Sequence, residues 1–74
     1  MNVDDIRTLR SARPFKPFVL VLENGEKLDV DFPFALGFSF SGDELTFISK
    51  SQRVRFLRPS DVREVIVNGA INHA

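Results

Sequence analysis

The chain has 74 residues, of which 43% are hydrophobic and 27% are charged, with eight phenylalanines and no cysteine. This length allows one small domain, and the composition is that of a folded globular protein rather than a disordered one. The absence of cysteine excludes disulfide bonds and thiolate metal sites. A core of this size supplies only about 3–5 kcal/mol of stability, so self-association is the expected supplement.

The formal net charge is zero, but the charges are unevenly distributed. Residues 1–17 hold four bases and two acids, residues 18–45 hold one base and six acids, and residues 46–74 hold five bases and two acids. This pattern gives no whole-chain attraction to nucleic acid. It does leave a local basic stripe that is a candidate nucleic-acid or partner contact: Lys50, Arg53, Arg55 and Arg58. The simpler interpretation is that acidic and basic strands lie side by side and pair across the sheet.

The N-terminal segment predicts one short amphipathic helix over about residues 3–12. Asn2 is a suitable N-cap, and Pro14 ends the helix because proline disfavours helical angles in the preceding residue. One apolar stripe recurs every three residues: Val3, Ile6 and Leu9. The following Pro-Phe-Lys-Pro-Phe segment, residues 14–18, is expected to be an extended connector whose phenylalanines insert into the core.

The rest of the chain predicts short strands. They are expected at about 18–23, 26–32, 45–49, 53–57 and 63–67, so that residues 1–67 form a single domain and 68–74 a flexible tail. Asn24-Gly25 predicts a type I′ hairpin turn. Residues 33–41 are consistent either with a short strand or with an apolar loop, and residues 59–62 with a single helical turn.

Alternation along these strands predicts a core built on phenylalanine. The residues expected in phase are Phe18, Phe32, Phe47 and Phe56, together with Leu20, Leu22, Leu28, Val30, Leu45 and Val54. The last strand is apolar on both faces, so it is the expected oligomer edge: Val65, Ile66 and Val67.

The order of elements resembles a known family. The hairpin Leu20-x-Leu22-x-Asn24-Gly25-x-x-Leu28, preceded by a short helix and followed by Val62-x-x-Val65, is similar to the Sm-like (Hfq-type) family. The resemblance implies an all-β domain with one N-terminal α-helix, a small SH3-like or Sm-like barrel of about five strands, and an RNA-binding ring. Three positions depart from the family. Val30 replaces a strand-bending glycine, Leu36 replaces a loop aspartate, and Phe56-Leu57-Arg58 replaces the aromatic-Lys-His signature that contacts RNA.

A second resemblance rests on Pro14-Phe15-x-Pro17-Phe18, the same hairpin, Pro33, and a Ser41-x-Asp43 turn. This pattern is similar to a group of short PFxPF proteins of planctomycete-type bacteria. It implies a bacterial single-domain protein and no particular activity.

The sequence contains no recognisable arrangement of catalytic residues. The single histidine, His73, is next to the C-terminus, and no serine has a base near it in sequence. Asp29 and Asp31 share a strand face about 7 Å apart, a spacing that allows a carboxylate pair or a contact with a divalent cation, but alternating charge is typical of any half-exposed strand. Glycines are scattered, so no phosphate loop is expected. We therefore expect no enzyme activity, no catalytic residues, no cofactor and no metal.

Two functions remain. The first is a non-catalytic interaction module that self-associates as a homo-oligomer through strand edges. The alternative is an Sm-like ring that binds RNA through the basic strand. With no signal-peptide pattern and no apolar run of membrane-spanning length, we expect a cytoplasmic protein without a membrane partner.

Overall fold

The fold is mostly β, with one N-terminal helix, as the sequence predicts. In a computed structural model, the backbone is described for residues 2–67 and 70–73, and the side chains for residues 2–67. The elements in chain order are α1 (Val3–Ser11), β1 (Phe18–Leu22), β2 (Lys27–Val30), the 3₁₀ turn η1 (Pro33–Ala35), β3 (Leu36–Phe38), β4 (Leu45–Ile48), β5 (Val54–Leu57), the 3₁₀ turn η2 (Pro59–Asp61), β6 (Val62–Val67) and β7 (Ala70–His73).

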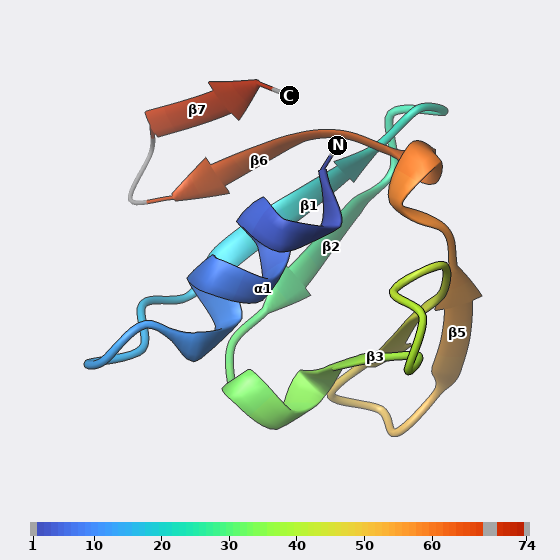
Figure 1. The fold of residues 1–74 in the computed structure, drawn as a ribbon, viewed down its shortest axis with the longest axis horizontal. Helices are drawn as coiled ribbons and strands as arrows, with labels where there is room; N and C mark the ends of the chain where they lie inside the picture. The colour runs from blue at the N-terminus through green and yellow to red at the C-terminus, as the bar shows by residue number, and fades with distance from the viewer. Residues whose placement is uncertain (1, 68–69, 74) are drawn as a thin grey trace.

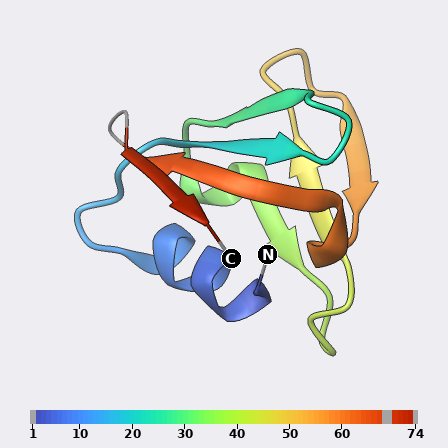
Figure 2. The ribbon, with the colours of Figure 1, turned by 90° about the horizontal axis from the view of Figure 1, so that it is seen from above.

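The strands form two antiparallel sheets. The first has the order β2-β1-β6-β7 and the second has the order β3-β4-β5. Over the described residues the hydrogen bonds do not join these sheets into one closed barrel. The chain passes from the first sheet to the second through η1, which follows β2 and leads directly into β3 (Figure 1). In Figure 2 the strand β5, in light orange, lies to the right of the ribbons of β1, β2 and β6.

The helix α1 begins and packs as expected. The Asn2 Oδ1 atom accepts a 2.8 Å hydrogen bond from the Asp4 N–H group, which satisfies one of the free amides of the first turn. The Ile6 side chain is fully buried in the same cluster as residues of both sheets, and Val3 and Leu9 pack partly against it. The apolar stripe therefore fixes the helix to the core, and α1 crosses in front of β1 and β2 in Figure 1.

The β1–β2 hairpin is confirmed, but the predicted type I′ turn is wrong. The closing hydrogen bond runs from the Leu22 N–H group to the Glu26 carbonyl at 2.8 Å, which leaves a three-residue loop. Only Gly25, at φ +89°, has a left-handed backbone; Asn24 does not, and its Oδ1 atom accepts from the Glu26 N–H group. This is the turn in which glycine follows a type I turn and forms a bulge. One positive φ is needed instead of two.

The core contains Phe18 and Phe47, as predicted, whereas the prediction that Phe32 and Phe56 are buried is wrong. Phe56 is 74% exposed and Phe32 is 50% exposed. The prediction for Val54 is also wrong. The strand β5 points Leu57 inward and its even-numbered residues, Val54 and Phe56, outward. The other predicted aliphatic members are all buried: Leu20, Leu22, Leu28, Val30 and Leu45.

The C-terminal part also differs from the prediction. The expected tail contains β7, which pairs with β6 from Val67↔Ala70 to Glu64↔His73. The strand β6 therefore lies between β1 and β7, so Val65, Ile66 and Val67 are not at a sheet edge. The remaining tail residues 68, 69 and 74, and the His73 side chain, lie outside what the structure describes.

Candidate interaction surface

Two ion pairs connect the acidic hairpin with the basic segment across the seam between the sheets. Lys50 Nζ lies 3.1 Å from Asp31 Oδ2, and the Arg55 guanidinium contacts the Glu26 carboxylate. No strand pairing links β2 to β4 or β5 in the described residues. The expected pairing of acidic and basic strands across one sheet is therefore wrong, because these strands lie in different sheets. Their side chains meet across the seam instead, through two of the four residues of the basic stripe.

The other two stripe residues flank β5. Arg53 comes just before the strand, and Arg58 just after it, where its N–H group donates to Asp61 Oδ2 at 2.9 Å and so helps to form η2. Both residues are exposed. The four bases are thus divided between the β4–β5 turn, the inward side of β5 and the two ends of that strand.

Two helix arginines have structural contacts that the sequence does not reveal. The Arg7 and Arg10 guanidinium carbons lie 5.0 and 5.6 Å from the centre of the Phe38 ring, and Arg10 Nε donates to the Pro33 carbonyl at 2.9 Å. A cation over an aromatic face stabilises the contact between them. These bases therefore hold α1 against η1 and β3.

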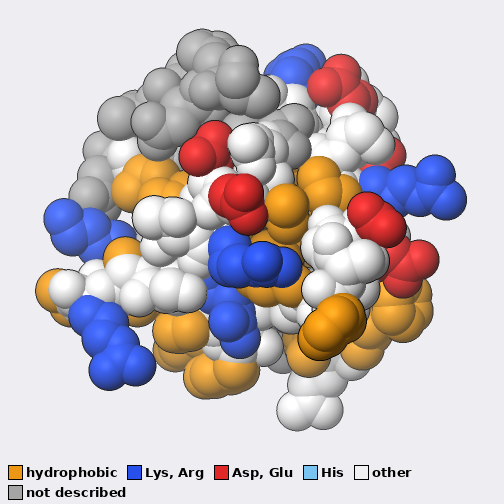
Figure 3. Space-filling model, viewed as in Figure 1, with side chains coloured by type: hydrophobic (Ala, Val, Ile, Leu, Met, Phe, Trp, Pro, Cys, Tyr) orange, Lys and Arg blue, Asp and Glu red, His pale blue; other side chains and the backbone are white. Residues whose placement is uncertain are grey.

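Large apolar side chains are exposed outside the core. They are Phe32, Phe34, Phe40, Ile48, Val54 and Phe56. Ile48 pairs with Val54 and Thr46 pairs with Phe56, so three of these side chains share the outer face of the second sheet. Figure 3 shows one side of the molecule, where hydrophobic side chains reach the surface among charged ones. An apolar outer sheet face is typical of an interaction surface.

The strand β5, which carries Val54 and Phe56, has a free backbone edge. The β4–β5 loop closes with a hydrogen bond from the Ser49 N–H group to the Arg53 carbonyl. Antiparallel pairs alternate between bonded and non-bonded, so the register places Val54 and Phe56 in non-bonded pairs with β4. Their N–H and C=O groups consequently point away from β4. Since β5 is the last strand of its sheet, no described strand pairs with these groups.

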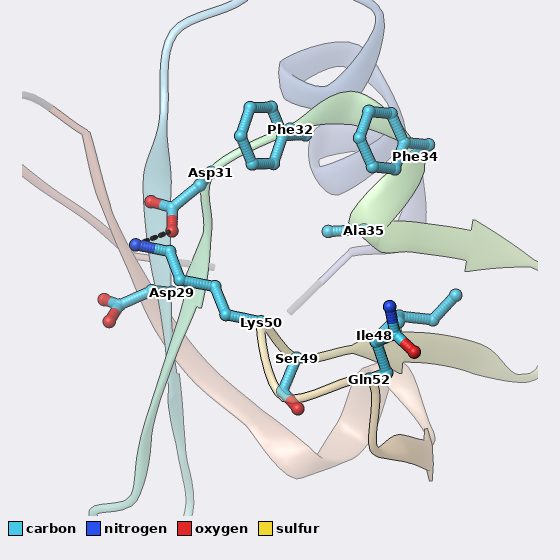
Figure 4. Close-up of a pocket in the computed structure, with 9 residues that line it drawn as sticks. All are labelled: Asp29, Asp31, Phe32, Phe34, Ala35, Ile48, Ser49, Lys50 and Gln52. Atoms are coloured by element: carbon cyan, nitrogen blue, oxygen red, sulfur yellow. Dashed lines mark ion pairs between the residues drawn. The ribbon is translucent and has the colours of Figure 1, made fainter.

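A groove lies between the segment after β2 and the β4–β5 turn. It encloses about 540 Å³. The Phe32 and Phe34 rings stack beside it with centroids 5.1 Å apart and an interplanar angle of 7°. Figure 4 shows these rings above the groove, with Ile48 and Ser49 on the opposite wall and Lys50 reaching across to Asp31. The groove is not evident from the sequence, because alternation along the strand assigns Phe32 to the core.

No family model, curated protein or solved structure matches this chain.

Among the described residues, no three His, Asp or Glu side chains gather as metal ligands do. The described part of the chain also contains no helix with the length and apolar character needed to cross a bilayer. Asp29 and Asp31, the two carboxylates expected on one strand face, both line the groove.

Proposed function

We propose that this chain is a non-catalytic interaction module that self-associates through the free edge of β5. A strand edge with unpaired N–H and C=O groups is a template for another strand. The β5 edge combines such groups at Val54 and Phe56 with apolar side chains that are 52% and 74% exposed. This coincidence of free backbone and exposed apolar surface on the same two residues carries the proposal.

The arrangement that uses all of these groups is an antiparallel pair of β5 strands related by a two-fold axis. Val54 of each copy then lies opposite Phe56 of the other, and both residues of each pair exchange N–H···O=C hydrogen bonds. The apolar side chains of the two copies meet on one face of a continuous sheet. A two-fold contact uses the same edge twice, so it needs no second free edge.

Charge and size limit the strength of this contact. The two Arg55 residues face each other across the axis, and like charges directly opposite weaken a strand pair. Each of them is paired with Glu26 of its own chain, which reduces this repulsion. A four-residue strand also buries less surface than a permanent dimer needs. We therefore expect a dimer that forms and dissociates with concentration.

An SH3-like or Sm-like small barrel is the finer architecture that we propose. The strand path supports it: β2 leads through η1 into β3, so β6-β1-β2 and β3-β4-β5 follow one another along a single bent path. An RNA-binding ring is the competing function. A head-to-tail ring needs two different free edges. The edge expected from the sequence, β6, is paired with β1 and β7, so such a ring would have to use another outer strand, such as β2.

Size-exclusion chromatography with light scattering, over a wide range of protein concentration, tests self-association. We expect the mass to rise from the 8.4 kDa of the chain toward twice that value. Val54→Pro removes an edge-facing donor and is tolerated at an edge position, so it should keep the protein monomeric. Phe56→Ser should do the same, whereas the matched control Phe34→Ser, at a side chain that is 73% exposed, should leave the dimer intact.

Two results would reject this proposal. One is a monomer mass at every concentration. The other is binding of a labelled single-stranded RNA that falls with salt and with Arg53→Gln and Arg58→Gln, accompanied by a ring-sized mass, since this result favours the competing function.

A further inference from the structure

The groove beside Phe32 and Phe34 continues along the edge of β2. A second cavity, of about 380 Å³, adjoins the first and shares Asp29, Asp31, Ser49 and Lys50 with it. The inward Leu28 and the outward Lys27 both line this second part. A groove lined by both faces of a strand runs along its edge, and this edge belongs to β2 and is separate from the β5 edge.

The backbone of β2 has free groups on this edge. Leu22 and Glu26 close the hairpin with a hydrogen bond, so the alternation of the register places Lys27 and Asp29 in non-bonded pairs with β1. Their N–H and C=O groups point away from β1, toward the groove. No described strand occupies the groove side of β2.

One part of the groove is acidic. Asp31 is paired with Lys50, whose side chain is 81% exposed, and such surface pairs are weak and easily replaced. Asp29 forms no ion pair with any described base. Lys27 is a second base of the groove, but it lines only the second cavity. At the first cavity two carboxylates therefore face one weakly held ammonium, which favours a cationic ligand and disfavours a phosphate backbone.

The other part of the groove is apolar and aromatic. The stacked Phe32 and Phe34 rings are 50% and 73% exposed, and Ala35 and Ile48 complete this part (Figure 4). The flat faces of such rings accept apolar side chains or a guanidinium group.

We infer that this groove binds an extended peptide segment of a partner protein, one that carries a basic side chain close to an apolar one. The peptide backbone adds to the β2 edge at Lys27 and Asp29, in the manner of β-strand addition. Its basic side chain pairs with Asp29 and displaces Lys50 from Asp31. Side chains two residues apart on a strand lie on the same face, about 7 Å from each other. The peptide side chain two residues from the basic one therefore reaches the Phe32 and Phe34 rings.

A fluorescein-labelled peptide in which arginine, phenylalanine and leucine alternate with threonine tests this inference by fluorescence anisotropy. We expect saturable binding to the full chain, and no binding of the same peptide with glutamate in place of arginine. Asp29→Asn should weaken binding about tenfold through loss of a charge-assisted contact, and Phe34→Ser should also weaken it. Asp43→Asn, which removes an exposed acid in the β3–β4 turn, should leave the affinity unchanged.

Amide NMR spectra locate the peptide. Shifts centred on Lys27, Asp29 and the β4–β5 turn support the inference, and shifts centred on Val54 and Phe56 overturn it while leaving the β5 proposal standing. The inference is also overturned if the arginine and glutamate peptides bind equally, if neither binds, or if a labelled single-stranded RNA displaces the arginine peptide. Because Phe34→Ser also serves as the dimer control, its mass distribution separates loss of peptide binding from loss of self-association.

Discussion

The β1–β2 and β4–β5 hairpins have the same turn geometry but opposite surfaces. Both close a three-residue loop with one hydrogen bond, and both place the last loop residue in the left-handed region: Gly25 at φ +89° and Gln52 at φ +65°. In β2 the outward residues Lys27 and Asp29 are charged, whereas in β5 the outward residues Val54 and Phe56 are apolar. The outward face of β2 is therefore polar, and that of β5 is apolar.

This difference shows how far the alternation of side chains along a strand identifies its buried face. A period of two separates two faces of a strand, but it identifies the buried face only when one set is clearly polar. In β5 the inward pair is Arg55 and Leu57 and the outward pair is Val54 and Phe56. Hydrophobicity alone therefore selects the wrong face, and the arginine faces inward because Glu26 meets it at the seam.

Truncation of one buried and one exposed phenylalanine should give the largest difference in the free energy of unfolding. Phe47→Ala removes a ring that is 4% exposed and should lower the free energy of unfolding by about 3–5 kcal/mol, which leaves little of the fold. Phe56→Ala should cost less than about 1 kcal/mol in the monomer, because this ring is in water.

The measurement is urea unfolding followed by circular dichroism at a low protein concentration, where self-association does not contribute. Equal losses in the two variants would restore Phe56 to the core and remove the β5 surface from the proposed function.

Much of the fold is predictable where local chemistry is unambiguous. The N-cap, the apolar helix stripe, the hairpin and the strands around Leu20, Leu28 and Leu45 all follow from local signals. The outer face of β5 and the groove do not, because they depend on where a second element lies. Arg55 can face inward only next to Glu26, and Phe32 is left outside because the chain bends into η1 immediately after it. Neither partner is visible in the local pattern.

The glycine turn offers the next largest effect. Gly25→Gln places a side chain at a left-handed position, and it should lower the free energy of unfolding by about 1–2 kcal/mol. Open space surrounds the position, so only the backbone angle opposes the change. Thermal unfolding, with Asn24→Gln as a control for the loop side chain, checks this. A neutral Gly25→Gln would mean that the loop does not need a left-handed residue.

The reverse substitution in the second hairpin should stabilise the protein. Gln52 already holds φ +65°, a conformation that glycine adopts without strain, while glycine adds entropy to the unfolded chain. The net gain expected for Gln52→Gly is about 0.5 kcal/mol. A rise in the midpoint of thermal unfolding supports the shared turn geometry, and a fall of the same size contradicts it. The double variant with Gly25→Gln should show additive effects because the turns are in separate sheets.

The ion pairs across the seam are expected to have the smallest effect. Arg55 and Glu26 are 40% and 42% exposed in their side chains, and Lys50 is 81% exposed, so solvent screens both interactions. A double-mutant cycle with Glu26→Gln and Arg55→Gln should give a coupling energy of about 0.5–1 kcal/mol, and the cycle with Asp31→Asn and Lys50→Gln should give less than about 0.5 kcal/mol. High salt should reduce both values. A coupling above about 2 kcal/mol at the first pair would contradict this view, because a pair of that strength holds the sheets together. Peptide entry between β2 and the β4–β5 turn would then require a much larger opening of the seam.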